Sequence, residues 1–260
     1  MQVVTAQCRE LVEVFTGLRP RQFQRLVRAV HREGGRALGP DRPGRPWALT
    51  LEERVLLVAM YCRTNLTMRQ LAPLFGISPA AVGRIISRHG PLLVLAPGKR
   101  KPGRHQVLIV DGTLVPTRDW TVFTSSKNYR YSANLQVLIK AETRVVLAVG
   151  RPLPGNRNDC TAFAESGSED ACGNATVIAD GGYQGTGIFM PHRRQAGQDQ
   201  LPDWKEQHNA SHRRVRARAE HAFVRMKNWR ILRDCRLKGE GVYWATSSVA
   251  HMHNLALSRA

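Results

Sequence analysis

The chain has 260 residues, of which 39 are Lys or Arg and 20 are Asp or Glu, so its formal net charge is +19. This length allows one large domain or two modest ones, and the excess positive charge indicates a polyanionic partner, most commonly nucleic acid. No apolar run approaches the roughly 18 residues of a membrane-spanning helix, and the five scattered cysteines form no CxxC pair, which argues against a disulfide framework or structural zinc.

The first predicted element is a short amphipathic helix at residues 20–33. Its apolar residues recur at i, i+3, i+4 and i+7, the spacing of one helix face: Phe23, Leu26, Val27 and Val30. The Gly-, Pro- and Arg-rich stretch at 34–46 is typical of a linker. We therefore predict an N-terminal helical segment and linker over residues 1–46.

Residues 47–96 contain three predicted helices, each preceded by a capping residue: 51–63 after Thr50, 67–75 starting at Thr67, and 79–88 after Ser78. A tight turn containing Gly76 joins the last two, as in a helix-turn-helix motif. The last helix would then enter a major groove, and three of its outward residues are candidates for DNA contacts: Arg84, Ser87 and Arg88. An ordinary helical hairpin is the alternative interpretation, but the net charge favours DNA binding.

A basic linker at 97–105 precedes a different kind of sequence. The apolar run QVLIVDG is typical of a buried strand, LQVLIK and RVVLAVG predict a hairpin, and NDCTAF predicts a short helix. A second buried strand follows in ATVIADGGYQG, and the pattern turns helical from about 212 to 230. Residues 106–260 are therefore predicted to form an α/β domain, preceded by the all-α helix-turn-helix domain.

Three acids in this domain are candidates for chemistry. Asp111 and Asp180 follow the two buried strands, although Asp-Gly is also a common turn signal. Glu220 lies in the basic helix VRARAEHAFVRMKNW, where 100° per residue puts Arg216 about 40° to one side of it and Lys227 about 20° to the other. An Arg216–Glu220 ion pair, worth about a few tenths of a kcal/mol, is the alternative interpretation, but it leaves Lys227 on that face unexplained.

Three carboxylates among cations suit metal-dependent phosphodiester chemistry. Two Mg²⁺ ions, about 4 Å apart, can neutralise the phosphate, deprotonate the attacking oxygen and stabilise the leaving oxygen. Mg²⁺ needs only a few carboxylates because it keeps several waters, and no histidine or cysteine cluster in the sequence competes for a softer metal.

These motifs resemble the Asp-Asp-Glu triad of bacterial insertion-sequence transposases, in the branch related to Harbinger-type elements. Asp111 in VDGT, Asp180 in ADGGYQG and Glu220 in the helix match the triad. The two cations on the Glu220 face stand at the intervals of the family's third motif, and Arg213 occupies the position of its tyrosine. The segment SSKNYRYSANLQV, with Lys127, resembles a lysine-rich family segment. GNRNDCTAF resembles another, which makes Asp159 a candidate site-adjacent residue as well as a candidate helix cap.

The resemblance, which covers roughly residues 50 to 255, implies a ribonuclease H-like catalytic domain, a mixed central sheet flanked by helices. It also implies dependence on two Mg²⁺ ions, with Mn²⁺ as a substitute, and catalysis by Asp111, Asp180 and Glu220. The implied partner is double-stranded DNA, both the terminal inverted repeats of an element and its target, held by Lys127, Arg216, Lys227 and the helix-turn-helix residues. A homo-oligomer on DNA in the bacterial cytoplasm, associated with the nucleoid when bound, is expected.

The sequence thus predicts a DNA transposase that cleaves and transfers strands. Two alternatives stay open at this point. One is an endonuclease that cuts without joining strands, and the other is a transposase-derived DNA-binding protein whose acids are idle.

Overall fold

The computed structural model describes residues 3–34, 46–98, 100–128 and 131–258. They form two compact units. Residues 35–45 of the predicted N-terminal linker and residue 99 of the predicted basic linker lie outside the described residues.

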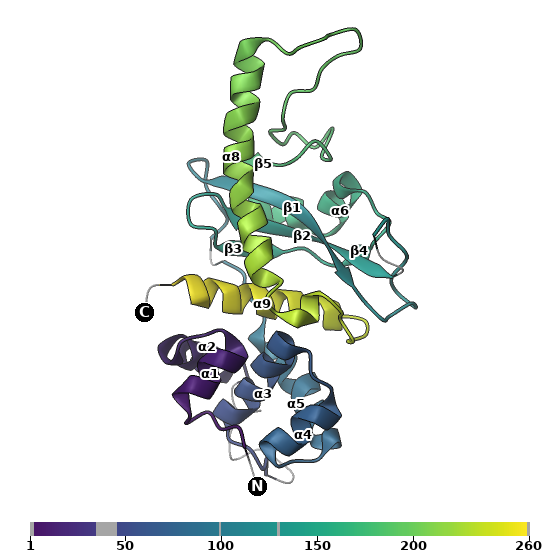
Figure 1. Cartoon of the computed structure of the whole chain (residues 1–260). Coiled ribbons are helices and arrows are strands. Elements are labelled where there is room, and N and C mark those ends of the chain that lie inside the picture. The colour runs from purple at the N-terminus through teal and green to yellow at the C-terminus, as the bar shows by residue number, and fades with distance from the viewer. Residues whose placement is uncertain (1–2, 35–45, 99, 129–130, 259–260) are drawn as a thin grey trace. The chain divides into compact units, whose positions relative to one another are not determined.

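The first unit is helical and comprises residues 1–96, 226–236 and 240–260. In chain order its elements are α1 (Arg9–Thr16), α2 (Pro20–Gly34), α3 (Leu51–Thr64), α4 (Met68–Phe75), α5 (Pro79–His89), η2 (Gly90–Leu93), η3 (Arg230–Leu232) and α9 (Gly241–Leu257), as labelled in Figure 1. Helices α2 to α5 confirm the predictions at 20–33, 51–63, 67–75 and 79–88 to within one residue at each end.

Local sequence determines where these helices begin. Thr50 and Thr67 form complete capping boxes with Glu53 and Gln70, and the Ser78 side chain caps α5 ahead of its first-turn proline. All residues of α3 from 54 to 62 are buried, because this helix is apolar nearly all round and lies at the centre of the unit. Helices α4 and α5 then pack beside it as the predicted helix-turn-helix.

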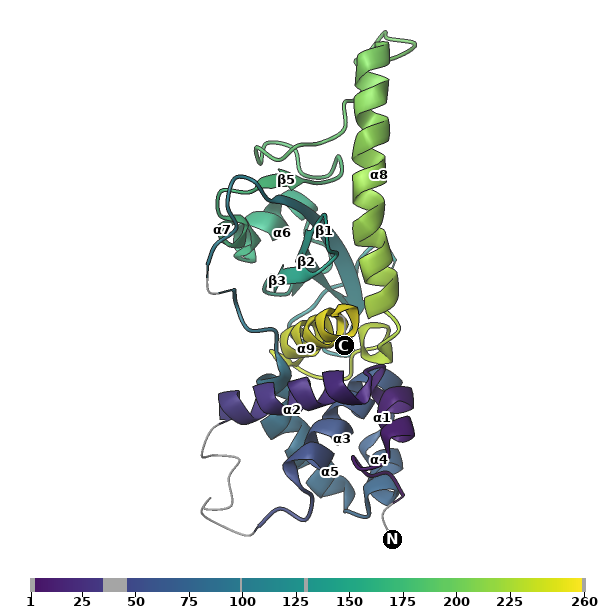
Figure 2. The same cartoon turned by 90° about the vertical axis from the view of Figure 1, so that its left-hand side faces the viewer.

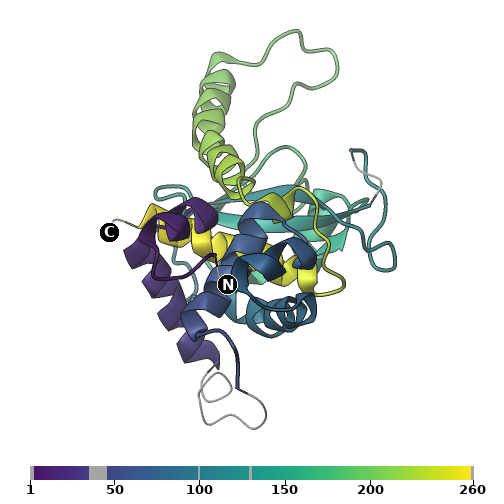
Figure 3. The ribbon, with the colours of Figure 1, turned by 60° about the horizontal axis from the view of Figure 1, so that its bottom comes forward.

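Helix α9 joins the N-terminal helices, although the predicted boundary kept residues 106–260 together. Figure 3 shows it (yellow) beside the purple and blue N-terminal helices. Gln22 Nε2 donates to the Ser258 carbonyl at 3.0 Å, and a Cβ at Gly90 would lie 2.8 Å from the Trp244 ring. The reason is that α9 has little polar surface of its own, so it must be covered on most sides.

The second unit comprises residues 97–225 and 237–239. Its sheet contains β1 (Val107–Pro116), β2 (Ser132–Lys140), β3 (Val146–Val149), β4 (Leu153–Pro154) and β5 (Thr176–Ile178), in the order β3-β2-β1-β5 with β4 also paired to β2. Strands β1 and β2 are antiparallel, as are β2 and β3, whereas β1 and β5 are parallel. The sheet is therefore mixed, and the predicted 135–140 and 144–150 hairpin is confirmed.

Helices cover both faces of this sheet. Figure 2 shows α6 (Asp159–Glu165) and α7 (Ser168–Cys172) on one side and α8 (Asp203–Met226) on the other. The core beneath α6 and α7 is built on Leu108, Val110 and Leu138 of the central strands, with Phe163 and Tyr183 packed against them. This mixed sheet flanked by helices is the ribonuclease H-like architecture expected from the sequence.

Two local predictions need correction. Asp111 does not end its strand, because β1 continues to Pro116 and Gly112 stays paired with Gln136 of β2. The Asp-Gly pair is therefore not a turn. Helix α8 begins at Asp203 and ends at Met226 rather than spanning 212 to 230. Lys227 follows the helix end, so the helical angle that placed it on the Glu220 face does not apply.

Candidate active site

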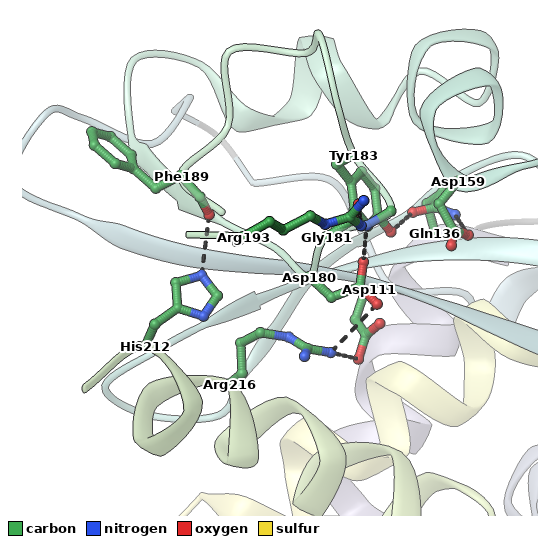
Figure 4. A network of polar contacts seen from close by, with 11 residues as sticks. Asp111, Gln136, Asp159, Asp180, Gly181, Tyr183, Phe189, Arg193, His212 and Arg216 are labelled. Carbon is green, nitrogen blue, oxygen red and sulfur yellow. Dashed lines mark hydrogen bonds and ion pairs between the residues drawn. The ribbon is translucent and has the colours of Figure 1, made fainter. Parts of the chain in front are cut away.

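Strand register brings Asp111 and Asp180 together. Ile109 of β1 is the parallel partner of Ile178 of β5, and each acid lies two residues further along its own chain segment. Residues at equal offsets from a parallel pair remain neighbours as long as the two segments run side by side. Figure 4 shows the two carboxylates close together at this point.

Arg216 reaches both acids. Its Nη2 atom lies 3.5 Å from Asp111 Oδ2 and 3.9 Å from Asp180 Oδ2. The side chain comes from the sheet-facing stripe of α8, where residues recur every three or four positions and are buried or half-buried: Asn209, His212, Arg216, Ala219 and Ala222. Small alanines in this stripe let α8 approach the sheet, so an arginine in the same stripe is directed at the acids.

Charge rather than hydrogen bonding holds Arg216 there. Both contacts are longer than ordinary N–H···O hydrogen bonds, and the buried Nε atom has no hydrogen-bond partner among the described residues. A guanidinium in a better-made site would use its planar fork for two short bonds. The position between Asp111 and Asp180 therefore attracts a cation, but its geometry does not match the hydrogen-bonding groups of the Arg216 guanidinium.

Burial raises the pKa of Asp111 to about 6, well above its usual value of 3.8. The Arg216 charge lowers this pKa, while the nearby carboxylates of Asp180 and Asp159 raise it further. The Asp111 side chain is only 17% exposed. Ionised Asp111 is therefore costly in this site, chiefly because it is buried, and the Arg216 charge offsets only part of that cost.

Asp159 is the third carboxylate of the site. It is the first residue of α6, but the capping role belongs to Asn158, whose side chain accepts from the Thr161 backbone. A Cβ at Gly112 would lie 2.6 Å from Asp159 Oδ1, and one at Gly182 would lie 3.2 Å from Asp159 Oδ2. Asp159, predicted as a candidate site-adjacent residue, thus lies against glycines that follow Asp111 and Asp180.

A buried polar network holds Asp159. Gln136 and Asn134 of β2 donate to Asp159 Oδ1 at 3.3 and 3.4 Å, and the Tyr183 hydroxyl donates to Gln136 Oε1 (Figure 4). Burial raises the pKa of Tyr183, so its hydroxyl remains a donor. Gln136 and Tyr183 were not predicted as site residues. The available signal was a glutamine inside the apolar strand LQVLIK, since a buried amide needs partners.

Glu220 is not brought to the two aspartates. It is exposed on α8, one turn beyond Arg216, and its side chain makes no hydrogen bond or ion pair with any described residue. The alternative Arg216–Glu220 ion pair is therefore not formed. Within the described part of the chain, no three His, Cys, Asp or Glu side chains adopt a metal-holding arrangement. Of the three predicted acids, Asp111 and Asp180 thus lie close together, whereas Glu220 lies one turn of α8 beyond Arg216.

The donor set nevertheless suits a hard cation. The carboxylates of Asp111 and Asp180 lie together, with Asp159 near them, and all three offer the oxygen ligands that Mg²⁺ prefers. The cation now between them is held loosely. These residues fit a divalent metal better than a structural ion pair.

The predicted DNA-contacting residues lie in different places. Arg84, Ser87 and Arg88 are exposed on α5, with the Arg88 guanidinium 5.7 Å from the centre of the Trp47 ring. Lys127 is exposed in the loop between β1 and β2, and no described residue bonds it. All are accessible. No described helix is long and apolar enough to cross a membrane.

Comparisons with known proteins agree with this picture. Residues 102–255 match the family model described as "Transposase DDE domain", and residues 47–98 match "Helix-turn-helix of DDE superfamily endonuclease". The chain is 61% identical, over 98% of both chains, to a Streptomyces albus G protein named as a transposase for insertion sequence element IS112. It is 28% identical, over 74% of this chain and 75% of the other, to a Microchaete diplosiphon protein named as a transposase for IS702.

Proposed function

Because this chain belongs to the DDE transposase family, we propose that it cuts DNA at the ends of a mobile element and joins those ends to target DNA. The observation that carries the proposal is the Asp111–Asp180 pair. Two carboxylates from neighbouring strands face one partly buried position that attracts a cation, which is what phosphodiester chemistry requires of a protein.

Asp111 and Asp180 would hold the metal, and Glu220 would complete the set from the next turn of α8. We infer two Mg²⁺ ions, with Mn²⁺ as a substitute. When bound, they neutralise the phosphate charge and activate the attacking water or 3′-hydroxyl. The chain's own part is to hold Asp111 on β1 beside Asp180, which follows β5. Metal binding would also require Arg216 to leave the two acids and the Glu220 side chain to turn toward them.

Arg216 has a second role in this proposal. A metal ion that replaces Arg216 between the acids would leave the Arg216 guanidinium without a counter-charge. A DNA phosphate would supply that counter-charge. Lys127 and Lys227 would add phosphate contacts. Each such contact makes binding more dependent on salt, because a condensed counterion is released from the DNA.

The helix-turn-helix would recognise the element's terminal inverted repeats. Arg84, Ser87 and Arg88 are exposed on α5, where a recognition helix carries its base and phosphate contacts. Two ends must be cut and joined to one target, so we also propose a homo-oligomer on DNA, acting in the bacterial cytoplasm and on the nucleoid.

The test uses a supercoiled plasmid that carries the gene with its native flanks. Purified protein is incubated with it in Mg²⁺, in EDTA, and as the variants Asp180→Asn and Asp170→Asn. Asp170 is an exposed acid of α7, so its variant matches the charge change without touching the site. We expect cuts at the element's borders and strand-transfer products with the wild type and Asp170→Asn in Mg²⁺ only.

Other outcomes identify the alternatives. Border cuts without strand-transfer products would indicate an endonuclease. DNA that is bound but uncut under every condition would indicate a DNA-binding protein with idle acids, and it would contradict the proposed catalysis. Cutting by Asp180→Asn at the wild-type rate would remove Asp180 from the active site.

A further inference from the structure

A second arginine lies against the acid-bearing loop. The Arg193 Nη2 atom donates to the Gly181 carbonyl, one residue after Asp180. A Cβ at Gly181 would lie 2.5 Å from Arg193 Nη2 and 3.0 Å from its Nε, so the guanidinium rests on the bare Cα of this glycine. Figure 4 shows Arg193 and Arg216 approaching the acids from different directions.

The backbone near Arg193 is fixed on two sides. The Phe189 amide donates to the Val177 carbonyl at 2.9 Å, and the Phe189 carbonyl accepts from the Ala179 amide at 3.0 Å. These two bonds pair Phe189 with the β5 segment as in a parallel sheet. Three residues later the Asn209 side chain of α8 bonds both the amide and the carbonyl of His192, at 2.8 and 3.0 Å. The backbone of His192, the residue before Arg193, is therefore hydrogen-bonded to α8, which restrains the position of Arg193.

The guanidinium keeps most of its donors available. Arg193 is exposed, and its bond to the Gly181 carbonyl uses one of the five N–H groups of an arginine. No acidic side chain among the described residues pairs with it. A carbonyl neutralises no charge, so this cation still attracts an anion. Arg216, in contrast, is already engaged by two carboxylates.

A structural role for Arg193 is limited to one exposed hydrogen bond, which contributes little to folding in water. The neighbouring Arg194 shows what such a role looks like: its Nη1 donates to the Asp199 carbonyl at 3.0 Å, within its own loop. The two arginines share charge, exposure and sequence context, but only Arg193 contacts Gly181, the residue that follows Asp180. This difference needs a functional explanation.

We propose that Arg193 holds the DNA phosphate that undergoes cleavage, with Gly181 kept as glycine to let its guanidinium lie beside Asp180. This rests on the proposed function, because it assigns a substrate-phosphate contact in that same site. The planar fork of arginine matches two oxygens of one phosphate. The Arg193 side chain would keep its contact with Gly181 whether or not Arg216 lies between the acids.

The experiment measures binding and cleavage separately. The probe is a short duplex containing the border of the gene's flanking DNA, with a neutral methylphosphonate placed at each phosphate near the border in turn. Affinity is measured by fluorescence anisotropy in EDTA, and cleavage is measured in Mg²⁺. The proteins are wild type, Arg193→Ala, Arg193→Lys and the matched control Arg194→Ala, all as full chains, with thermal unfolding as the check on folding.

At one position we expect the methylphosphonate and Arg193→Ala each to weaken binding by roughly 10-fold or more, the effect of losing a hydrogen bond between charged groups. Combined, they should weaken it no further, because both remove the same contact. Arg194→Ala should lose as much affinity with the neutral phosphate as the wild type does. Arg193→Lys should fall between, since it keeps the charge without the fork.

In Mg²⁺ that same phosphate should be the one cut, and Arg193→Ala should cut it roughly 10- to 100-fold more slowly than Arg194→Ala. Additive losses at every phosphate, or equal behaviour of the two alanine variants, would overturn the Arg193 assignment. A wild type that never cuts, but shows the coupling in EDTA, would overturn the proposed catalysis and keep Arg193 as a phosphate-binding residue.

Discussion

Asp111→Asn should make the metal-free protein more stable at neutral pH. Burial and neighbouring carboxylates raise the pKa of Asp111 from 3.8 to about 6, so the ionised form is disfavoured in the folded protein. The shift corresponds to about 3 kcal/mol, and the side chain is 17% exposed, so screening by solvent reduces this only in part. Asparagine resembles the protonated acid and removes this cost.

The raised pKa of Asp111 also determines how its contribution to the free energy of unfolding changes with pH. A carboxyl with a raised folded-state pKa binds its proton more tightly in the folded chain than in the unfolded chain. Stability from this group is thus present below about pH 4 and is lost as the pH rises to about 6. The variant should equal the wild type near pH 4 and exceed it by about 1 to 3 kcal/mol at pH 8, which is several degrees in unfolding temperature.

The assay is thermal unfolding in EDTA across this pH range, repeated with Mg²⁺. Asp119→Asn is the matched control of opposite sign. Hydrogen bonds from the Thr121 side chain and the Gly239 backbone lower the pKa of Asp119, so its ionised form stabilises the folded chain and the variant should lose stability above about pH 4. Added Mg²⁺ should stabilise the wild type and leave Asp111→Asn unchanged. An Asp111→Asn protein no more stable than wild type at pH 8 would refute the electrostatic argument.

Three further predictions concern single substitutions. Gly112→Ala should destabilise the protein by about 1 to 3 kcal/mol in urea unfolding, because the new Cβ would meet Asp159 Oδ1 at 2.6 Å. The control Gly103→Ala should leave the free energy of unfolding unchanged, because a Cβ there meets no atom within 4 Å. Glu220→Gln should abolish plasmid cleavage and leave the mobility shift of border DNA intact; retained cleavage would exclude it as a metal ligand. Arg84→Ala should weaken binding to border DNA by about 1 to 3 kcal/mol in competition with unrelated duplex, and equal loss on both DNAs would assign Arg84 to the phosphate backbone instead.

Helices α2 to α5 of the first unit were predictable because their signals are local, whereas α1 (Arg9–Thr16) was not predicted. Capping residues and apolar spacing at 50–88 determine the elements without any partner. Helix α9 was not predicted, because a segment with little polar surface shows no amphipathic period. Its assignment to the first unit depends on contacts with α2 and η2, which are distant in sequence.

The acid pair was predictable in kind, but its geometry was not. Carboxylates beside apolar runs are visible in a sequence, whereas the parallel register that brings Asp111 beside Asp180 belongs to the folded sheet. Arg216 shows the same limit. Its spacing from Glu220 was correctly read, but which side of α8 faces the sheet depends on the small side chains of Ala219 and Ala222. Helical phase therefore placed Arg216 on the acids and left Glu220 exposed.

The glycines after Asp111 and Asp180 share one feature, although the turn interpretation is correct for the second acid: Gly181 and Gly182 lie in a turn, and the Gly182 amide donates to Asp180 Oδ1 at 2.8 Å. Gly112 is extended strand, and its missing Cβ leaves room for the Asp159 carboxylate. Gly182 gives room to that same carboxylate from the other strand's loop, and Gly181 gives room to the Arg193 guanidinium. In each case a charged side chain occupies the place of a Cβ, at 2.5 to 3.2 Å. Because these glycines have no Cβ, charged groups from other elements can approach Asp111 and Asp180 closely. A site that holds a metal and a phosphate needs such close approach.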